Sequence, residues 1–299
     1  MADRRRSPAP PLPPASTWRT LVELAVAEDL GPGDVTTPLV VASGRRGAAR
    51  IEARQSLVVC GLGVAAAVFE AVDPGLRLRE HLGDGADAAA GDELARVEGS
   101  LASILVAERT ALNFLMRLCG VATLARRFVE AVAGSGARIV DTRKTLPGWR
   151  SLDKYAAAVG GAENHRLGLF DGVLLKDNHV ALAGGVALAV KAARAWAPAG
   201  LRVQVEVESE DDAVAAVEAG ADFLLLDNRS PDELRRIVRR LEGRALLEAS
   251  GGVRLDNVRE VAASGVGRIS IGALTHSAPA ADVSLEILPE EPDAGGVRG

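Results

Sequence analysis

The sequence predicts an α/β protein with a small N-terminal α+β domain and an incomplete C-terminal parallel α/β barrel. At 299 residues the chain is longer than most single domains. Up to about residue 133, helical stretches are mixed with runs in which apolar and polar residues alternate, as they do in half-exposed strands. From residue 136 onward, short apolar runs and Ala-rich helical stretches follow each other regularly, which is typical of a parallel sheet.

The composition indicates a globular protein, and we expect it in the cytoplasm. The net charge is -5 and aromatic residues make up 3% of the chain, so we expect no nucleic-acid partner. No run of 18 apolar residues occurs, so we expect no membrane span. Cys60 and Cys119 lack the spacing of a zinc site or a disulfide framework, which favours a reducing compartment.

Both ends of the chain are expected to be disordered tails. Residues 1–17 are rich in proline, and their arginines are not followed by the apolar core of a signal peptide. Residues 289–299 are polar and rich in Gly and Pro.

Residues 18–118 form the predicted N-terminal domain, and we leave open whether residues 280–288 return to it. Apolar residues at helical spacing over 18–30 end at Gly31-Pro32-Gly33, which stops a helix. Ser100 can cap a long helix to about residue 118, and residues 121–132 continue as helix. The other expected elements are a helix at 64–72 and strands at 48–53, 57–60, 76–82 and 93–97.

A glycine motif in this domain resembles a cofactor-binding fingerprint. Residues 61–66 fit GxGxxA, the dinucleotide-binding pattern, after a predicted strand and before a predicted helix. The segments that follow alternate like an antiparallel sheet and not like a βαβ unit. We therefore interpret the motif as a packing turn.

Residues 119–279 form the predicted barrel domain, with six or seven strands instead of the standard eight. Six apolar runs are centred on Ile139, Val173, Val205, Leu225, Leu247 and Ile269. The helical stretches between them are 185–197, 211–219, 231–241 and 256–264. We interpret the acidic pair Asp211-Asp212 as a helix start, because it has no apolar run immediately before it and no Thr-Gly after it.

The predicted strands end in polar or glycine-rich sequence, and parallel strands bring such ends to one edge. Cationic residues follow the first two apolar runs, carboxylates lie at the ends of the next two, and glycine-rich turns follow the last two. These residues are Thr142, Arg143 and Lys144; Lys176; Glu206 and Glu208; Asp227 and Asn228; Glu248 and Ser250-Gly251-Gly252; and Gly272 and Ala273. Exposed N–H groups in such turns bind phosphate, although the alternative is that the glycines only make tight turns. The set suits an anionic substrate with a ribose-like polyol.

Lysine is rare in this chain and concentrated in one stretch. Of 35 basic residues only Lys144, Lys154, Lys176 and Lys191 are lysines, and three of them lie within 141–179. A lysine kept where arginine is the usual cation can mark a position that needs a compact ammonium. For Lys154, chance remains an equally good explanation.

These motifs resemble the quinolinate phosphoribosyltransferases over about residues 18–288. The most specific matches are DTRKTLPGWR (141–150), NHRLGLFDGVLLKDNH (164–179), LEASGGV (247–253) and IGALTHSAP (271–279); EDLGPGDVTT (28–37) and ERTALNFL (108–115) agree as well. Leu146, Trp149 and Ala162 depart from the family pattern, and none of these departures removes a charge.

The resemblance implies transfer of phosphoribosyl from phosphoribosyl pyrophosphate to quinolinate, with Mg²⁺, giving nicotinate mononucleotide, pyrophosphate and CO2 in NAD biosynthesis. Arg109, Arg143, His165 and Arg166 are implied to hold the quinolinate carboxylates. Lys144 and Lys176 are implied to meet the phosphoribosyl donor, and Glu206 and Asp227 to bind its ribose hydroxyls and the metal. The residues implied to hold the 5′-phosphate are Ser250, Gly251, Gly252, Gly272 and His276, with Thr142 and Ala273 also at the substrate site.

The resemblance also implies an N-terminal sandwich domain and a homodimer, or a multiple of dimers, in which Arg109 reaches the neighbour's site. From spacing alone Arg109 is a solvated helix residue. It lies off the apolar stripe formed by Ala107, Ala111, Phe114, Leu115 and Leu118.

Three alternatives remain at this point. A Schiff-base lyase would use Lys144 or Lys176, but both stand among charged neighbours, and such a lysine needs desolvation. A non-catalytic binder of phosphate ligands would use the same turns. Related phosphoribosyltransferases of the same fold act on nicotinate or other acceptors.

Overall fold

The structure is a computed structural model that describes residues 8–288, and the chain divides into two compact units. The N-terminal unit comprises Met1–Gly120 and Pro279–Gly299, and the C-terminal unit comprises Val121–Ala278. The expected tail at 289–299, and residues 1–7 of the expected N-terminal tail, lie outside the described residues.

For residues 8–17 the expectation of disorder is wrong. Ala15–Thr17 form the 3-10 turn η1, and the Trp18 indole Nε1 donates to the Pro13 carbonyl at 2.9 Å. The reason is the buried ring of Trp18, which is only 5% exposed and anchors the segment before it.

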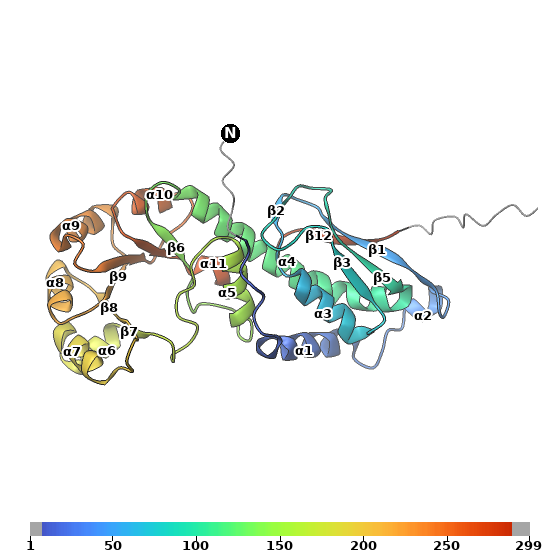
Figure 1. Ribbon diagram of the computed structural model, residues 1–299, viewed down its shortest axis with the longest axis horizontal. Helices are drawn as coiled ribbons and strands as arrows, with labels where there is room; N and C mark the ends of the chain where they lie inside the picture. Colours follow the sequence, from blue (N-terminus) through green and yellow to red (C-terminus); the bar gives the residue numbers. More distant parts are fainter. Residues whose placement is uncertain (1–7, 289–299) are drawn as a thin grey trace, which may run out of the picture. The chain divides into compact units, whose positions relative to one another are not determined.

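The N-terminal unit is built on a four-stranded antiparallel sheet in the order β12-β1-β5-β3. These strands are β12 (Val283–Ile287), β1 (Arg46–Ala53), β5 (Glu93–Ser100) and β3 (Arg77–Glu80), and a second, small pair joins β2 (Leu57–Val58) to β4 (Asp87–Ala88). Its helices are α1 (Arg19–Leu30), α2 (Thr37–Val40), α3 (Leu62–Val72) and the first part of α4 (Leu101–Ala131). Strand β12 pairs with β1 from Ala49↔Ile287 to Ala53↔Val283, so the end of the chain joins this sheet (Figure 1).

The glycine motif at residues 61–66 is a packing turn. Gly61 has φ +98°, and a Cβ there would lie 2.5 Å from the Leu118 side chain. The Gly61 N–H donates to the Asp84 carboxylate at 2.9 Å, so an acid already occupies the position that a phosphate would need.

Helix α4 is one continuous helix, in agreement with the prediction that the helix after Ser100 continues beyond residue 121. The Ser103 N–H donates to Ser100 Oγ at 3.3 Å, so Ser100 caps the first turn as expected. Gly120 lies at the boundary between the units, and a Cβ there would lie 2.2 Å from the Pro279 carbonyl. This small residue lets the returning chain cross the helix closely.

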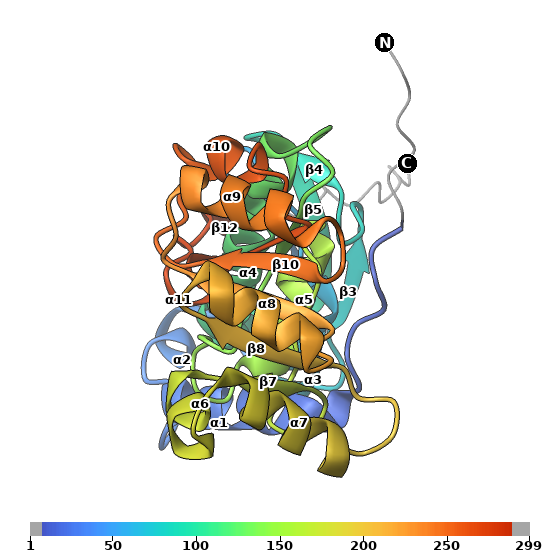
Figure 2. The same cartoon turned by 90° about the vertical axis from the view of Figure 1, so that its left-hand side faces the viewer.

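The C-terminal unit contains the predicted parallel sheet of six strands, in the order β6-β11-β10-β9-β8-β7. The strands are β6 (Arg138–Val140), β7 (Val173–Leu175), β8 (Val203–Val207), β9 (Phe223–Asp227), β10 (Leu246–Ser250) and β11 (Arg268–Ser270). The four helices predicted between the strands are α7 (Val186–Trp196), α8 (Glu210–Glu218), α9 (Pro231–Leu241) and α10 (Val258–Ala262), which form an outer arc around the strands (Figures 1 and 2).

Three helices of this unit were not predicted: α5 (Arg150–Val159), α6 (Asp177–Ala183) and α11 (Ala273–His276). Helices α6 and α11 are short, so they carry little periodic signal. Helix α5 has polar residues at helical spacing, Arg150, Asp153 and Lys154, and the structure buries Asp153 and Lys154 together with the apolar face.

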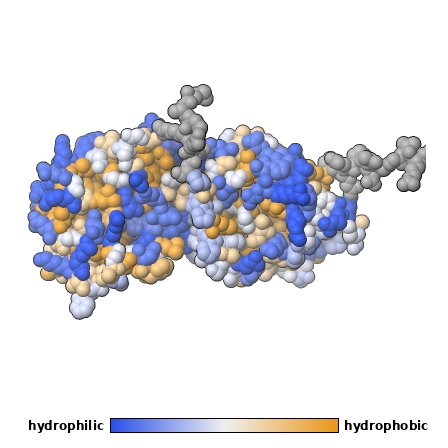
Figure 3. Space-filling model, viewed as in Figure 1, coloured by the Kyte–Doolittle hydropathy of each residue, from blue (hydrophilic) through white to orange (hydrophobic). Residues whose placement is uncertain are grey.

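On the face seen in Figure 3, hydrophilic and hydrophobic residues are interspersed over both units. Within residues 8–288, no helix is both long enough and apolar enough to cross a membrane.

Candidate active site at the carboxyl ends of the parallel strands

A cavity of about 790 Å³ lies at the carboxyl ends of the parallel strands of the C-terminal unit. Its walls contain Thr142, Arg143, Lys144, His165, Arg166, Lys176, Glu206, Asp227, Ser250, Gly251, Gly252, Gly272, Ala273 and His276, as predicted. Of the other polar residues at the strand ends, Glu248 lines the cavity, whereas Glu208 and Asn228 do not. The strand register explains this grouping, because Asp227 lies opposite Ser250 and Ser250 opposite Ser270 on neighbouring strands. Strand ends that are far apart in sequence therefore meet at one rim.

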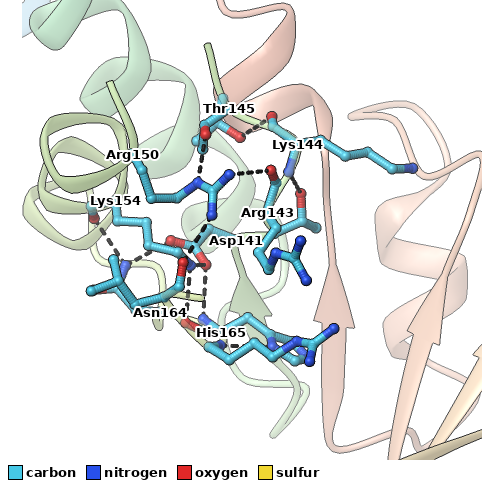
Figure 4. Close-up of polar contacts among 12 residues, drawn as sticks. Asp141, Arg143, Lys144, Thr145, Arg150, Lys154, Asn164 and His165 are labelled. Atoms are coloured by element: carbon cyan, nitrogen blue, oxygen red, sulfur yellow. Dashed lines mark hydrogen bonds and ion pairs between the residues drawn. The ribbon is translucent and has the colours of Figure 1, made fainter. Parts of the chain in front are cut away.

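The basic residues Arg143, Lys144, Arg166 and Lys176 form the cationic wall of the cavity. Hydrogen bonds of the loop hold the backbone of Lys144 in place. The Lys144 N–H donates to Thr142 Oγ1 at 3.0 Å, and Thr275 Oγ1 donates to the Lys144 carbonyl at 2.8 Å. Both bonds engage the backbone of Lys144, and its side chain extends away from Asp141 (Figure 4).

Arg143 and Arg166 form the part of this wall best suited to carboxylates. Arg143 Nε is buried and makes no hydrogen bond within residues 8–288. Burial and the neighbouring charge of Arg143 lower the pKa of Arg166, whose Nη1 donates to the Gly172 carbonyl at 3.1 Å. Two partly desolvated guanidinium groups close to each other favour an anionic ligand between them.

Arg150 was missed as a site residue, although it lies in a motif that the sequence analysis singled out. Its Nε donates to Thr145 Oγ1 at 2.6 Å, its Nη2 to the Arg143 carbonyl at 3.1 Å and its Nη1 to the Leu167 carbonyl at 2.8 Å. It therefore ties the loop after β6 to the segment that carries His165 and Arg166 (Figure 4).

The acidic wall consists of Glu206 on β8 and Asp227 on the neighbouring strand β9. Burial and then the charge of Asp227 raise the pKa of Glu206. Two carboxylates that repel each other in a cavity leave a place for a cation. Over residues 8–288, no three acidic, His or Cys side chains are arranged to hold a metal by themselves. The pair nevertheless fits Mg²⁺, which commonly takes one or two carboxylates and completes its shell with water and substrate phosphate.

The glycine-rich wall follows β10 and β11. Gly251 has φ +86°, and a Cβ there would lie 2.2 Å from Asn228 Oδ1, so this position requires glycine. At Gly272 a Cβ would lie 3.0 Å from the Lys144 side chain. The contact at Gly251 accounts for that glycine as part of a close-packed turn, and phosphate binding by the turns stays a prediction.

A network of buried polar groups lies beneath the cationic wall. The Lys154 ammonium forms an ion pair with Asp141, which also accepts from Asn164 Nδ2 at 2.7 Å (Figure 4). Glu248, which the sequence analysis noted only as a strand-end carboxylate, is fully buried, and its Oε1 lies 3.5 Å from His165 Nε2. For Glu248 a sequence signal was available, because it stands inside an apolar run, where an unpaired charge is costly.

Arg109 lies in the N-terminal unit, on α4, and its side chain is 60% exposed. Its Nη2 lies 4.0 Å from Glu108 Oε1, and the predicted apolar stripe of the helix is buried. Arg109 therefore points off that stripe, as predicted, and its implied role in a partner's site stays a prediction.

Comparisons with known proteins agree with this architecture. Two family models match: the N-terminal domain of quinolinate phosphoribosyl transferase over residues 34–119 and its C-terminal domain over residues 121–286. A probable nicotinate-nucleotide pyrophosphorylase (carboxylating) from Synechocystis is 38% identical over 94% of this chain and 97% of its own length. A quinolinate phosphoribosyltransferase (decarboxylating) from Nicotiana tabacum is 36% identical over 93% and 84%. The solved nicotinate-nucleotide pyrophosphorylase from Francisella tularensis superposes with a TM-score of 0.88 at 36% identity, over 92% of this chain and 97% of that one.

Proposed function

Because this chain belongs to the quinolinate phosphoribosyltransferase family, we propose that it makes nicotinate mononucleotide from quinolinate and phosphoribosyl pyrophosphate. The observation that carries the proposal is one cavity in which cations, a pair of carboxylates and glycine-rich turns converge. A dicarboxylate and a phosphorylated sugar need these three groups of ligands.

Arg143 and Arg166 form the clamp for the two carboxylates of quinolinate. A guanidinium group can bind a carboxylate through two parallel hydrogen bonds, which fixes the plane of the pyridine ring. The buried, unbonded Nε of Arg143 supports this role, since a carboxylate would supply its missing acceptor.

The phosphoribosyl donor is bound by Lys144, Lys176, Glu206 and Asp227. The ammonium groups of the two lysines attract the pyrophosphate as point charges. The turns at Ser250-Gly251-Gly252 and Gly272 bind the 5′-phosphate. Glu206 and Asp227 accept hydrogen bonds from the ribose hydroxyls and would hold Mg²⁺. When bound, the metal neutralises part of the pyrophosphate charge.

The reaction follows from how charge moves. Departure of pyrophosphate leaves an oxocarbenium-like sugar and a growing negative charge, which Lys144 and Lys176 offset. The pyridine nitrogen bonds to the anomeric carbon and becomes a cation. That cation stabilises the carbanion left on the adjacent carbon when its carboxylate departs as CO2, and a proton then replaces the CO2. The protein needs no covalent nucleophile, because positioning supplies a large part of the rate.

We also propose that the working form is a homodimer, or a multiple of dimers, with Arg109 of each subunit completing the clamp of its partner. The exposure of Arg109 supports this proposal, since its guanidinium is available to a second copy. A closed two-fold assembly would contain two such composite sites.

The direct test is a mass-spectrometric assay with phosphoribosyl pyrophosphate, Mg²⁺ and either quinolinate or nicotinate. We expect nicotinate mononucleotide and CO2 from quinolinate, preferred over nicotinate at least about a hundredfold in kcat/KM, because nicotinate leaves clamp charges unpaired. Equal use of nicotinate would refute the acceptor assignment. Binding of phosphoribosyl pyrophosphate without turnover would instead indicate a phosphate binder, and a borohydride-trapped adduct at Lys144 or Lys176 would indicate a Schiff-base enzyme.

A further inference from the structure

All four polar groups of His165 are hydrogen-bonded within the chain. Its backbone N–H donates to Asp141 Oδ1 at 2.8 Å, and its carbonyl accepts from Lys154 Nζ at 2.9 Å. Its ring Nδ1 accepts from the Arg166 backbone N–H at 2.7 Å, and its ring Nε2 lies 3.0 Å from Gln204 Oε1. The residue lines the cavity, yet it has no polar group left for a substrate carboxylate.

The partners of the ring determine its tautomer. A backbone N–H can only donate, so Nδ1 must be the unprotonated nitrogen. The proton then lies on Nε2 and is donated to Gln204 Oε1, with Glu248 Oε1 3.5 Å away. A ring in this state is neutral and directs its only N–H to Gln204, which does not line the cavity.

The charges around the ring agree with a neutral state. Glu248 on β10 favours the imidazolium, while Arg268 on β11 and Lys154 on α5 oppose it. Burial is the largest influence, and the net effect lowers the pKa of His165. Arg268 Nε lies 3.6 Å from Glu248 Oε2, so the carboxylate already has a cation beside it.

Gln204 lies one layer below the cavity. On β8 it precedes Glu206 by two residues, so both side chains point to the same face of the sheet. Glu206 lines the cavity, whereas Gln204 is 5% exposed and is not part of the cavity wall. An effect of Gln204 on substrate binding would therefore act through a residue that lines the cavity, such as its partner His165.

We propose that His165 is a positioning residue and not a quinolinate ligand, and that Gln204 holds its neutral, Nε2-protonated ring so that Arg166 is aimed into the cavity. Arg166 follows His165 directly, and its N–H is itself bonded to the ring. A ring fixed at both nitrogens fixes the peptide that carries the guanidinium. The kinetic part of this inference rests on the proposed function, whereas the tautomer does not.

The tautomer is read from long-range ¹H–¹⁵N spectra of the full-length protein labelled with ¹⁵N-histidine. The chain has only four histidines, and the signals missing from His165→Gln identify His165. We expect the neutral Nε2–H pattern from pH 7 to pH 8, unchanged when quinolinate is added. A cationic or Nδ1–H pattern, or a change of tautomer on adding quinolinate, overturns the proposal whether or not the enzyme turns over.

The positioning role is read from a double-mutant cycle. Gln204→Met keeps the volume but removes the acceptor, and it should raise KM for quinolinate about tenfold, because small displacements of a positioned group are costly. KM for phosphoribosyl pyrophosphate should stay within about twofold. In a His165→Leu background the same change should have almost no further effect, since the two residues act as one unit. Additive effects would show that Gln204 acts by another route.

Ser264→Ala is the matched control, because Ser264 is also buried in the C-terminal unit, and its hydroxyl donates to the Val261 carbonyl of the preceding helix α10, at 2.6 Å. It should leave both KM values unchanged. An equal rise in both KM values for Gln204→Met would indicate a general loss of structure and would contradict the proposal. If the wild-type protein makes no nicotinate mononucleotide, the proposed function fails, and the tautomer still decides the state of His165.

Discussion

Lys154 on α5 and Asp141 after β6 form an ion pair whose side chains are 4% and 0% exposed. The carboxylate has two further donors, Asn164 Nδ2 at 2.7 Å and the His165 N–H at 2.8 Å. The ammonium also donates to the His165 carbonyl at 2.9 Å. The pair thus connects the first strand of the barrel, the helix after it and the segment before Arg166.

Breaking one side of this pair should destabilise the protein strongly. Lys154→Met leaves Asp141 as an uncompensated buried charge, and we expect the free energy of unfolding to fall by about 3–5 kcal/mol in urea titrations. Adding Asp141→Asn should restore much of the loss, because no buried charge then remains. Lys191→Met, an exposed change on α7, should stay within about 0.5 kcal/mol of wild type. A small effect of Lys154→Met alone would mean that water reaches the pair.

Lys154 also shows what could be predicted from the sequence. The four lysines stood out by composition, but no spacing rule separated Lys154, which is buried, from Lys144 and Lys176, which line the cavity. The difference depends on α5, which buries Lys154 and Asp153 although both stand at the spacing of its polar face. Charge pairing across 13 residues is a tertiary relationship that no local pattern contains.

Elements with a clear period were predictable. Helix α9 runs from Pro231 to Leu241 as expected, since a Ser230 cap and regularly spaced apolar residues define it. The rim residues were found because the carboxyl ends of parallel strands must meet. The role of Gln204 was not found, because a single amide inside the apolar run of β8 has no sequence context to distinguish it.

Lys144 and Lys176 should each be needed for turnover. Lys144→Ala and Lys176→Ala should reduce kcat about a hundredfold or more, since each removes a preorganised charge that opposes charge on the leaving group. Both variants should keep the wild-type urea midpoint, because neither side chain is part of the core. Lys191→Ala is the control and should retain full activity. Near-normal turnover in both site variants would remove the lysines from the mechanism.

His165 should make stability depend on pH below its ordinary pKa of 6.5, because burial lowers the pKa of His165 in the folded state. Below pH 6.5 the unfolded chain takes up a proton that the folded chain resists. The contribution of His165 to stability is therefore complete above pH 6.5 and is lost as pH falls toward the folded pKa.

The check compares urea unfolding of wild type and His165→Gln at pH 7.5 and pH 5.5. Wild type should lose more stability on acidification, by at most about 1.4 kcal/mol per pH unit, the limit for one proton. Equal losses in the two proteins would mean that the ring titrates normally when folded.

Arg109 can be tested by complementation between subunits. Arg109→Ala and Lys144→Ala homodimers should both be nearly inactive. If Arg109 acts in its partner's site, a mixed dimer has one site with both lesions and one intact site, and mixing should restore up to about half of the wild-type activity per heterodimer. No recovery, with subunit exchange verified by mass spectrometry, would place Arg109 in its own subunit's site or outside any site.

The pairing of β12 with β1 has a consequence for synthesis on the ribosome. Strand β1 occupies an inner position of its sheet only because Val283–Ile287 hydrogen-bonds along one side of it. A nascent chain that ends before residue 283 already contains the whole C-terminal unit, yet β1 still presents an open row of backbone donors and acceptors. The domain translated first is thus completed last, and β1 stays open to mispairing with other nascent chains until residues 283–287 have been synthesised.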